Sequence, residues 1–188
     1  FTVGLGGDSR VRYDNKEDLF EIGPDRVKPL CCAVSEDPAL KGCLKRQKKP
    51  DGPKEPIIII KNRTGCEDGV LESNLNEGLK NGICSREALA EKGYISRIYF
   101  SKLEEMQKNG LLDFAGFTPT DALHILGKLD KWDREASVAG AEIISGHISS
   151  AEKTAAEVYK KFVVLAALNI FKKKHAPQRE WFLSYKGN

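Results

Sequence analysis

The segment Gly6-Gly7-Asp8-Ser9 carries residues that could contribute to chemistry, and it stands between two stretches of alternating apolar residues. Glycines lack the Cβ that blocks close approach, so this turn could bring backbone N–H groups to an anion. No helix is expected directly after it, whereas P-loops and dinucleotide fingerprints need a strand, glycines and then a helix N-terminus. Taken alone, the segment is more typical of a hairpin turn than of an anion site.

The segment Thr118-Pro119-Thr120-Asp121 predicts the start of a helix. Thr118 is the expected N-cap, Pro119 suits the first helical position, and Asp121 can reach back in a capping box. Capping alone explains these residues, but a helix N-terminus with two hydroxyls is also a place where phosphate or substrate can dock. His124 lies three residues after Asp121 on the same helical face, within hydrogen-bond reach. Asp121 and His124 are the candidate catalytic residues, although a packed surface histidine is a commoner role for His124 than a catalytic base.

Composition and charge bound the class of protein. The chain has 188 residues, 40% hydrophobic and 30% charged, which predicts one globular domain or two small lobes. Lys and Arg exceed Asp and Glu by 30 to 27, a net charge of +3 that gives little support to a nucleic-acid or membrane partner. The longest apolar stretch, residues 162–171, is about half of the roughly twenty residues that a bilayer crossing needs. We therefore expect no transmembrane helix.

The cysteines and the first residue indicate the cellular setting. None of the five cysteines falls in a C-x-x-C spacing, and an odd number cannot all pair within one chain, so we expect neither a complete disulfide framework nor a zinc ribbon. Small buried hydrophobes in a reducing cytoplasm are the simplest interpretation. Because the chain begins with Phe1 and carries no recognisable signal peptide, we expect it to be a piece of a longer polypeptide.

Periodicity predicts an α/β fold. Alternating apolar residues indicate short strands within residues 1–22, ending at a turn at Gly23-Pro24. Residues 35–56 are rich in charge and breakers and predict a surface loop. The β-branched run Ile57–Ile60 is too short for a helix, so we expect a buried strand that joins the N-terminal strands in one small sheet. Residues 1–60 thus form the sheet-rich part of a single domain or fragment.

The rest of the chain is expected to be helical. Residues 67–112 predict a helical insertion, and residues 113–175 predict several helices packed on the sheet, including a long amphipathic one from Ala155 to Ala166 that finishes in lysines. Residues 85–112 also resemble a winged-helix reader, with a helix, a glycine turn and a second helix. Residues 96–109 hold three cations and two anions, so that helix has no clear positive excess. A DNA-binding or regulatory domain is therefore the alternative function and not the first one.

Three segments in order resemble the hydantoinase and 5-oxoprolinase family, of the hydantoinase A type. They are Val3-Gly4-Leu5-Gly6-Gly7-Asp8-Ser9, Ile22-Gly23-Pro24-Asp25-Arg26-Val27, and the helix start Phe117-Thr118-Pro119-Thr120-Asp121-Ala122 with its following Leu126-Gly127. The resemblance implies a fold similar to one lobe, the second, of the actin, hexokinase and Hsp70 ATPases. It implies an ATP-dependent hydrolase that opens a cyclic amide ring, with ATP and Mg²⁺ as cofactors and unassigned metal ligands.

The resemblance also assigns expected roles to particular residues. Backbone donors and hydroxyls would hold the nucleotide, its metal or the substrate. The candidate cofactor-binding residues are Gly6, Gly7, Asp8, Ser9, Thr118 and Thr120, beside the candidate catalytic Asp121 and His124. The family's phosphate loops would lie upstream of Phe1, so we expect this chain to need the rest of its own polypeptide, or a partner subunit, for turnover. The substrate, a lactam or a hydantoin, is not fixed by these residues.

Overall fold

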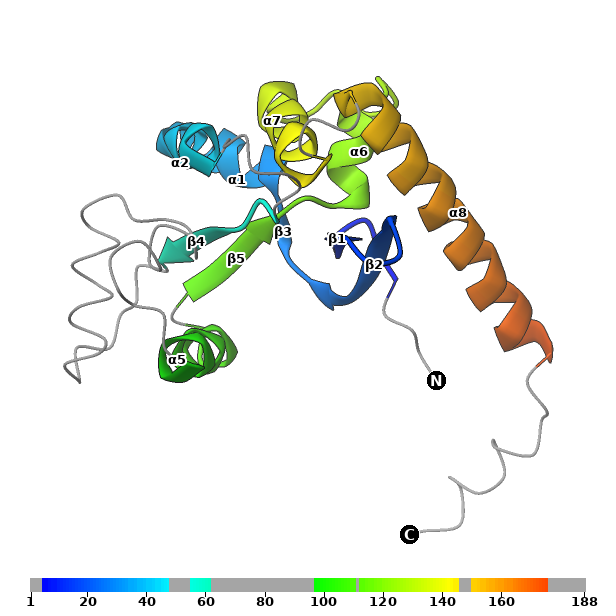
Figure 1. The fold of residues 1–188 in the computed structure, drawn as a ribbon, viewed down its shortest axis with the longest axis horizontal. Coiled ribbons are helices and arrows are strands. Elements are labelled where there is room, and N and C mark those ends of the chain that lie inside the picture. The colour runs from blue at the N-terminus through cyan, green and yellow to red at the C-terminus, as the bar shows by residue number, and fades with distance from the viewer. Residues whose placement is uncertain (1–4, 48–54, 62–96, 111, 146–149, 176–188) are drawn as a thin grey trace, which may run out of the picture.

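The computed structural model describes residues 5–47, 55–61, 97–110, 112–145 and 150–175. Within them the protein has a mixed α/β fold, as the sequence predicts (Figure 1). The strands are β1 (Ser9–Asp14), β2 (Leu19–Arg26), β3 (Lys28–Pro29), β4 (Ile58–Lys61) and β5 (Leu112–Gly116). The helices are α1 (Leu30–Glu36), the short 3₁₀ helix η1 (Pro38–Leu40), α2 (Lys41–Gln47), α5 (Arg97–Lys108), α6 (Pro119–Ile125), α7 (Arg134–Ser145) and α8 (Ala151–His175).

The described strands form two small sheets rather than one. β1 and β2 pair as an antiparallel hairpin, whereas β5 lies between β3, to which it is parallel, and β4, to which it is antiparallel. The expectation that Ile57–Ile60 joins the N-terminal strands was therefore wrong, because β4 pairs with β5, for example Ile58 with Ala115. The two sheets are linked through main-chain hydrogen bonds, among them Val11 N–H to the Phe117 carbonyl at 2.9 Å.

Two other local expectations were also wrong. The Gly23-Pro24 pair does not end the strand, because it forms a cis peptide within β2. Proline has no N–H to donate, and it is tolerated here because β2 is an edge strand. Residues 35–56 are not all loop, since η1 and α2 begin within the first half of that stretch. The reason is burial: α2 places Cys43 and Leu44 in the core, and two buried residues are too few to stand out among lysines.

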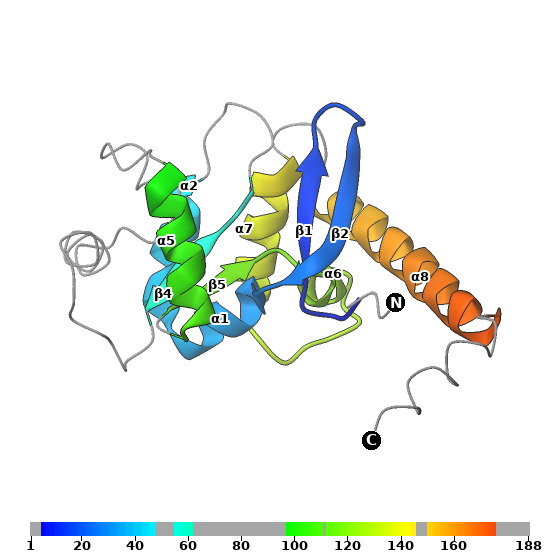
Figure 2. The same cartoon turned by 90° about the horizontal axis from the view of Figure 1, so that it is seen from below.

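The helices surround the sheets unequally. Figures 1 and 2 show α1, α2, α6 and α7 on one side of β4 and β5, with α5 on the other. The core between them includes the fully buried side chains of Leu30, Ile58, Phe117 and Ile144. The predicted helix over residues 96–109, the helix that starts at Thr118 and the long lysine-ended helix correspond to α5, α6 and α8 and are confirmed. Residues 62–96, most of the predicted insertion, lie outside the described residues.

Among the described helices, none is both long enough and apolar enough to cross a bilayer. The longest of them, α8, has 25 residues, and charged residues stand on both sides of its apolar stretch.

Gly140 on α7 is a close-approach position that yields a stability prediction. A Cβ there would lie 2.4 Å from Leu30 Cδ1 and 3.1 Å from Phe117 Cδ2, and both of these side chains are buried. Gly140→Ala should lower the free energy of unfolding by about 1–2 kcal/mol, because overpacking outweighs the better helix propensity of alanine. Urea unfolding measures this loss.

The control for Gly140→Ala is Ala139→Ser on the half-buried side of the same helix, which should change stability by less than about 0.5 kcal/mol. A Gly140→Ala protein as stable as the wild type would show that α7 does not sit this close to Leu30 and Phe117.

Candidate functional site

The diglycine turn and the start of α6 are in direct contact, although 113 positions separate Gly7 from Thr120. The Gly7 carbonyl accepts two hydrogen bonds from Thr120, one from its amide at 3.0 Å and one from its hydroxyl at 2.8 Å. A Cβ on Gly7 would lie only 2.7 Å from Thr120 Oγ1, so this contact requires glycine. Two of the three segments behind the family resemblance therefore meet in space.

The turn itself is closed by local bonds. Gly6 N–H donates to the Ser9 hydroxyl at 2.8 Å, and Ser9 N–H donates to the Gly6 carbonyl at 3.1 Å. Gly6, Gly7 and Asp8 are partly exposed, whereas Ser9 is fully buried. The Asp8 carboxylate pairs with the Arg26 guanidinium at 3.2 Å, which connects the turn to the end of β2. Gly6, Gly7 and Asp8 are thus the members of the predicted cofactor set that solvent reaches at this turn.

Asp121 lies fully inside the protein and holds two helix starts together. Its carboxylate accepts from the Leu30 and Cys31 amides of α1 at 3.2 and 2.9 Å, and from the Ser137 hydroxyl of α7 at 3.0 Å. It also accepts from the amide and hydroxyl of Thr118 at 3.0 and 2.8 Å, completing the capping box that the sequence predicts. Burial raises the pKa of Asp121, and the hydrogen bonds from Cys31, Thr118 and Ser137 oppose that rise.

His124 is also buried, with 1% of its surface exposed. Neither ring nitrogen has a hydrogen-bond partner among the described residues, and the ring stacks at a tilt against Trp132 with centroids 5.6 Å apart. Burial lowers the pKa of His124, although the nearby Asp121 and Asp130 carboxylates act in the opposite direction. The contacts make Asp121 and His124 inward-facing groups, and their catalytic role stays a prediction.

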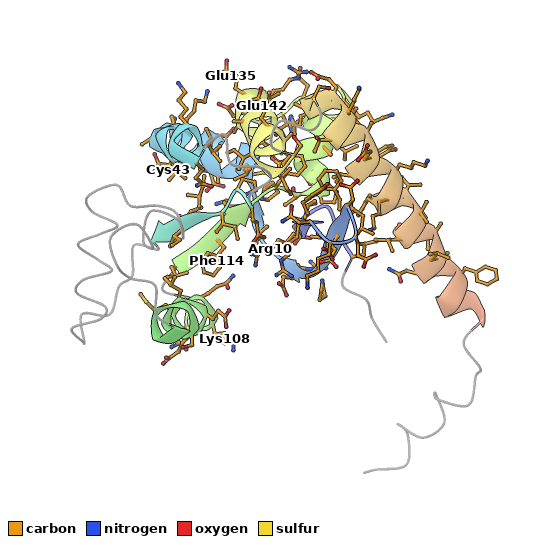
Figure 3. The ribbon with its side chains drawn as sticks, in the orientation of Figure 1. Arg10, Cys43, Lys108, Phe114, Glu135 and Glu142 are labelled. Atoms are coloured by element: carbon orange, nitrogen blue, oxygen red, sulfur yellow. The ribbon has the colours of Figure 1, made fainter. Side chains whose placement is uncertain are left out.

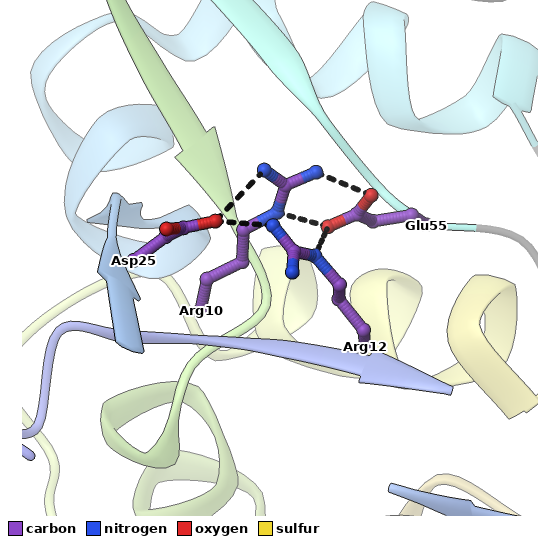
Figure 4. Close-up of polar contacts among 4 residues, drawn as sticks. All are labelled: Arg10, Arg12, Asp25 and Glu55. Carbon is purple, nitrogen blue, oxygen red and sulfur yellow. Dashed lines mark hydrogen bonds and ion pairs between the residues drawn. The ribbon is translucent and has the colours of Figure 1, made fainter. Parts of the chain in front are cut away.

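Two arginines and two carboxylates form a charge cluster that joins the two sheets (Figure 4). Arg10 of β1 binds both carboxylate oxygens of Glu55, which precedes β4, and lies 3.8 Å from Asp25 of β2. Arg12 pairs with Asp25 and lies 3.7 Å from Glu55. The Arg10 side chain is only 10% exposed, so its charge is compensated by neighbours rather than by water.

A polar cleft of about 370 Å³ opens beside this cluster. Arg10, Phe114 and Lys108, which line it, come from three different elements, β1, β5 and α5 (Figure 3). Its lining residues are Arg10, Asp25, Arg26, Val27, Glu104, Gln107, Lys108 and Phe114. The volume lies within the range of small-molecule sites, and Arg26 links the cleft to the diglycine turn through Asp8. Sequence reasoning assigned none of these residues to a site, although Asp25, Arg26 and Val27 stand in the second segment of the family resemblance.

The cysteines divide into two kinds. Cys31 and Cys32 are free thiols at the start of α1, and burial raises the pKa of both, so neither is a thiolate nucleophile near neutral pH. Cys43 is disulfide-bonded to a partner outside the described residues, so the expectation that each cysteine is a small unpaired hydrophobe was wrong for Cys43. Cytosolic proteins rarely keep such a bond, and the cytoplasmic location stays a prediction.

No site for a metal is formed by the part of the chain that the structure describes, where no three His, Cys, Asp or Glu side chains are grouped as ligands. The winged-helix alternative falls mostly outside the described residues. Its described helix, α5, exposes Glu104 and Glu105 beside Lys108, and such a face does not favour a phosphate backbone.

Comparisons with known proteins add no assignment. No family model matches the chain, and no match is found among the curated proteins or the solved structures.

Removing the Asp121 carboxylate should be among the most damaging single changes in this protein. The Asp121 carboxylate accepts five hydrogen bonds, and Asp121→Asn replaces one of its accepting oxygens with an amide group that donates. Buried N–H or O–H groups are then left unpaired. We expect a loss of about 3 kcal/mol or more in the free energy of unfolding, and about 1 kcal/mol for Ser137→Ala, which removes one donor. Urea unfolding separates these two losses.

The control for Asp121 is Asp130→Asn, an exposed position beyond the same helix, which should leave stability unchanged within about 0.5 kcal/mol. Equal stability of the Asp121→Asn and Asp130→Asn proteins would contradict the role of Asp121 as the shared helix cap.

Buried His124 predicts a pH dependence of stability. Because its folded-state pKa is lowered from 6.5, the unfolded chain binds more protons between the two pKa values, and stability should rise with pH in that window. One such group changes the free energy of unfolding by at most about 1.4 kcal/mol per pH unit, and it adds no slope above about pH 7. His124→Leu should flatten this slope, measured as urea midpoints from mildly acidic to neutral pH. Parallel curves for the two proteins would refute the prediction.

Proposed function

We propose that this chain forms one wall of the nucleotide and substrate cleft of an ATP-dependent hydantoinase or oxoprolinase-type hydrolase. The observation that carries the proposal is the contact between Gly7 and Thr120. It joins the diglycine turn to the proline-started helix, as a single site built from both motifs requires. The finer fold assignment, to the second lobe of an actin-like ATPase, belongs to the same proposal.

In this proposal the open side of the turn and the polar cleft receive the ligand. Gly6, Gly7 and Asp8 are partly exposed, and Arg26 and Lys108 place cationic side chains in the lining of the cleft. Glycine main chain and cations suit the anionic oxygens of a phosphate or carboxylate. Val27 and Phe114 add apolar lining that suits the ring of a small amide.

The residues present fit the two expected cofactors unequally. A phosphate-bearing nucleotide would contact the partly exposed main chain of the turn, because Asp8 and Thr120 fill the space where side chains on Gly6 and Gly7 would stand. Mg²⁺ has no ligand set among the described residues, since the Asp121 oxygens are occupied and no other acidic group gathers there. Bound ATP would supply a phosphoryl group that makes the amide carbonyl a better electrophile for water.

The roles of the inward-facing residues follow from their contacts. Asp121 caps α6 and α1 together, and the Thr120 hydroxyl donates a hydrogen bond to the Gly7 carbonyl. Both are therefore positioning residues for the turn. Thr118 is fully buried and bonds Asp121, which gives it the same task. The ligand-contacting groups are Gly6, Gly7, Asp8, Arg26 and Lys108, and turnover takes place together with the rest of the polypeptide or a partner subunit, in the cytoplasm.

The test is ATP-dependent ring opening by the complete polypeptide that contains this chain, with 5-oxoproline and hydantoins as substrates. Lys108→Gln should lower kcat/KM about tenfold or more without lowering the free energy of unfolding, because Lys108 is exposed. Thr120→Val should lower kcat/KM by a similar factor while Thr120→Ser, which keeps the hydroxyl donor to Gly7, stays close to wild type.

The matched control for Lys108 is Lys128→Gln, another exposed lysine, after α6, which does not line the cleft. Absence of ring opening with every cyclic amide, in the presence of ATP and Mg²⁺, would refute the proposed reaction. Ring opening that Lys108→Gln and Lys128→Gln leave equally unchanged would remove the cleft from the site.

A further inference from the structure

The outward face of the C-terminal half of α8 is apolar. Figures 1 and 2 show this half extending beyond the other elements. Val163, Val164, Leu168, Ile170 and Phe171 are 46%, 51%, 49%, 62% and 62% exposed. At 3.6 residues per turn, these side chains and exposed Ala167 cover an arc of about 160° on one side of the helix. The facing side, with Phe162, Leu165 and Ala166, is only partly buried.

This apolar face reverses the usual arrangement of a surface helix. In the N-terminal half of α8 the exposed positions hold Glu152, Lys153, Glu157 and Lys160, as expected beside water. After Lys160 the same face becomes apolar for about three turns. A helix that is apolar all round is normally buried, so the second half of α8 is built to be covered.

We propose that a second copy of this chain covers it, with the two α8 helices crossing antiparallel near Ala167. The five exposed side chains present roughly 500 Å² in one patch, which is as large as the largest apolar patch on a typical monomer. Two such patches bury about 1,000 Å² in total, the lower limit for a specific interface. The area therefore fits a reversible dimer that dissociates on dilution.

Charge selects the antiparallel arrangement. In a parallel pair the exposed Glu152, Glu157 and Lys160 would each lie opposite the same residue of the partner copy, which places like charges together. An antiparallel pair centred near Ala167 keeps Glu152 and Glu157 away from their own copies. It brings Lys160 opposite Lys174 of the partner copy, and it still places fewer like charges together than the parallel pair does. Ala167 at the crossing point lets the helices approach closely, with valines and isoleucine on either side.

Sedimentation velocity on the complete chain, over a wide concentration range, tests the dimer. We expect a monomer–dimer equilibrium that Leu168→Glu shifts to monomer, with no loss of thermal stability because Leu168 is about half exposed in the monomer. The matched control is Ala156→Glu, which adds the same charge to the same helix face outside the apolar stretch, and it should leave the dimer intact.

Cysteine cross-linking tests the direction. Ala167→Cys should give a disulfide-linked dimer under mild oxidation, whereas Ala156→Cys, about 11 residues from the crossing and hence far from its own copy, should not. Cross-linking at both positions would overturn the antiparallel arrangement. A chain that stays monomeric at all concentrations would overturn the dimer. The same holds if the monomer binds phospholipid vesicles and Leu168→Glu abolishes that binding.

Discussion

The Asp121 carboxylate is the contact on which the arrangement of the helices depends. One residue at the third position of α6 accepts hydrogen bonds from its own N-cap, from the first two amides of α1 and from a hydroxyl of α7. The first four amides of any helix lack partners within the helix, and here one carboxylate supplies partners for two helices at once. It thereby fixes α1, α6 and α7 around a common point.

That shared cap also positions the diglycine turn. Because Asp121 sets where α6 begins, it sets where the amide and hydroxyl of Thr120 point, and both donate to Gly7. The turn in turn connects through Asp8 to Arg26 at the rim of the polar cleft. Chemistry proposed at the exposed turn therefore rests on a buried carboxylate that need not touch the ligand, which is how a supporting residue acts on a site.

The sequence predicted what local patterns control. The Thr118 capping box, the strand over Ile57–Ile60 and the helix α5 each carry their signal within a few neighbouring residues. Residues far apart gave no such signal: nothing near Leu30 or Cys31 announces that their amides bond Asp121, about 90 positions later. β5 was missed because its five residues include Asp113 and Gly116, which are poor strand formers, and pairing on both sides overrides that weakness.

The same contrast separates the two ends of the candidate site. Thr118 and Asp121 looked like ligand-binding groups because capping residues and phosphate-binding residues share one chemistry, donors and acceptors at a helix start. Burial distinguishes the two uses, since Thr118 and Asp121 are fully enclosed and mutually bonded, while Gly6, Gly7 and Asp8 remain partly open. Sequence spacing cannot report burial at a helix start, because it depends on α1 and α7 closing over that start from distant parts of the chain.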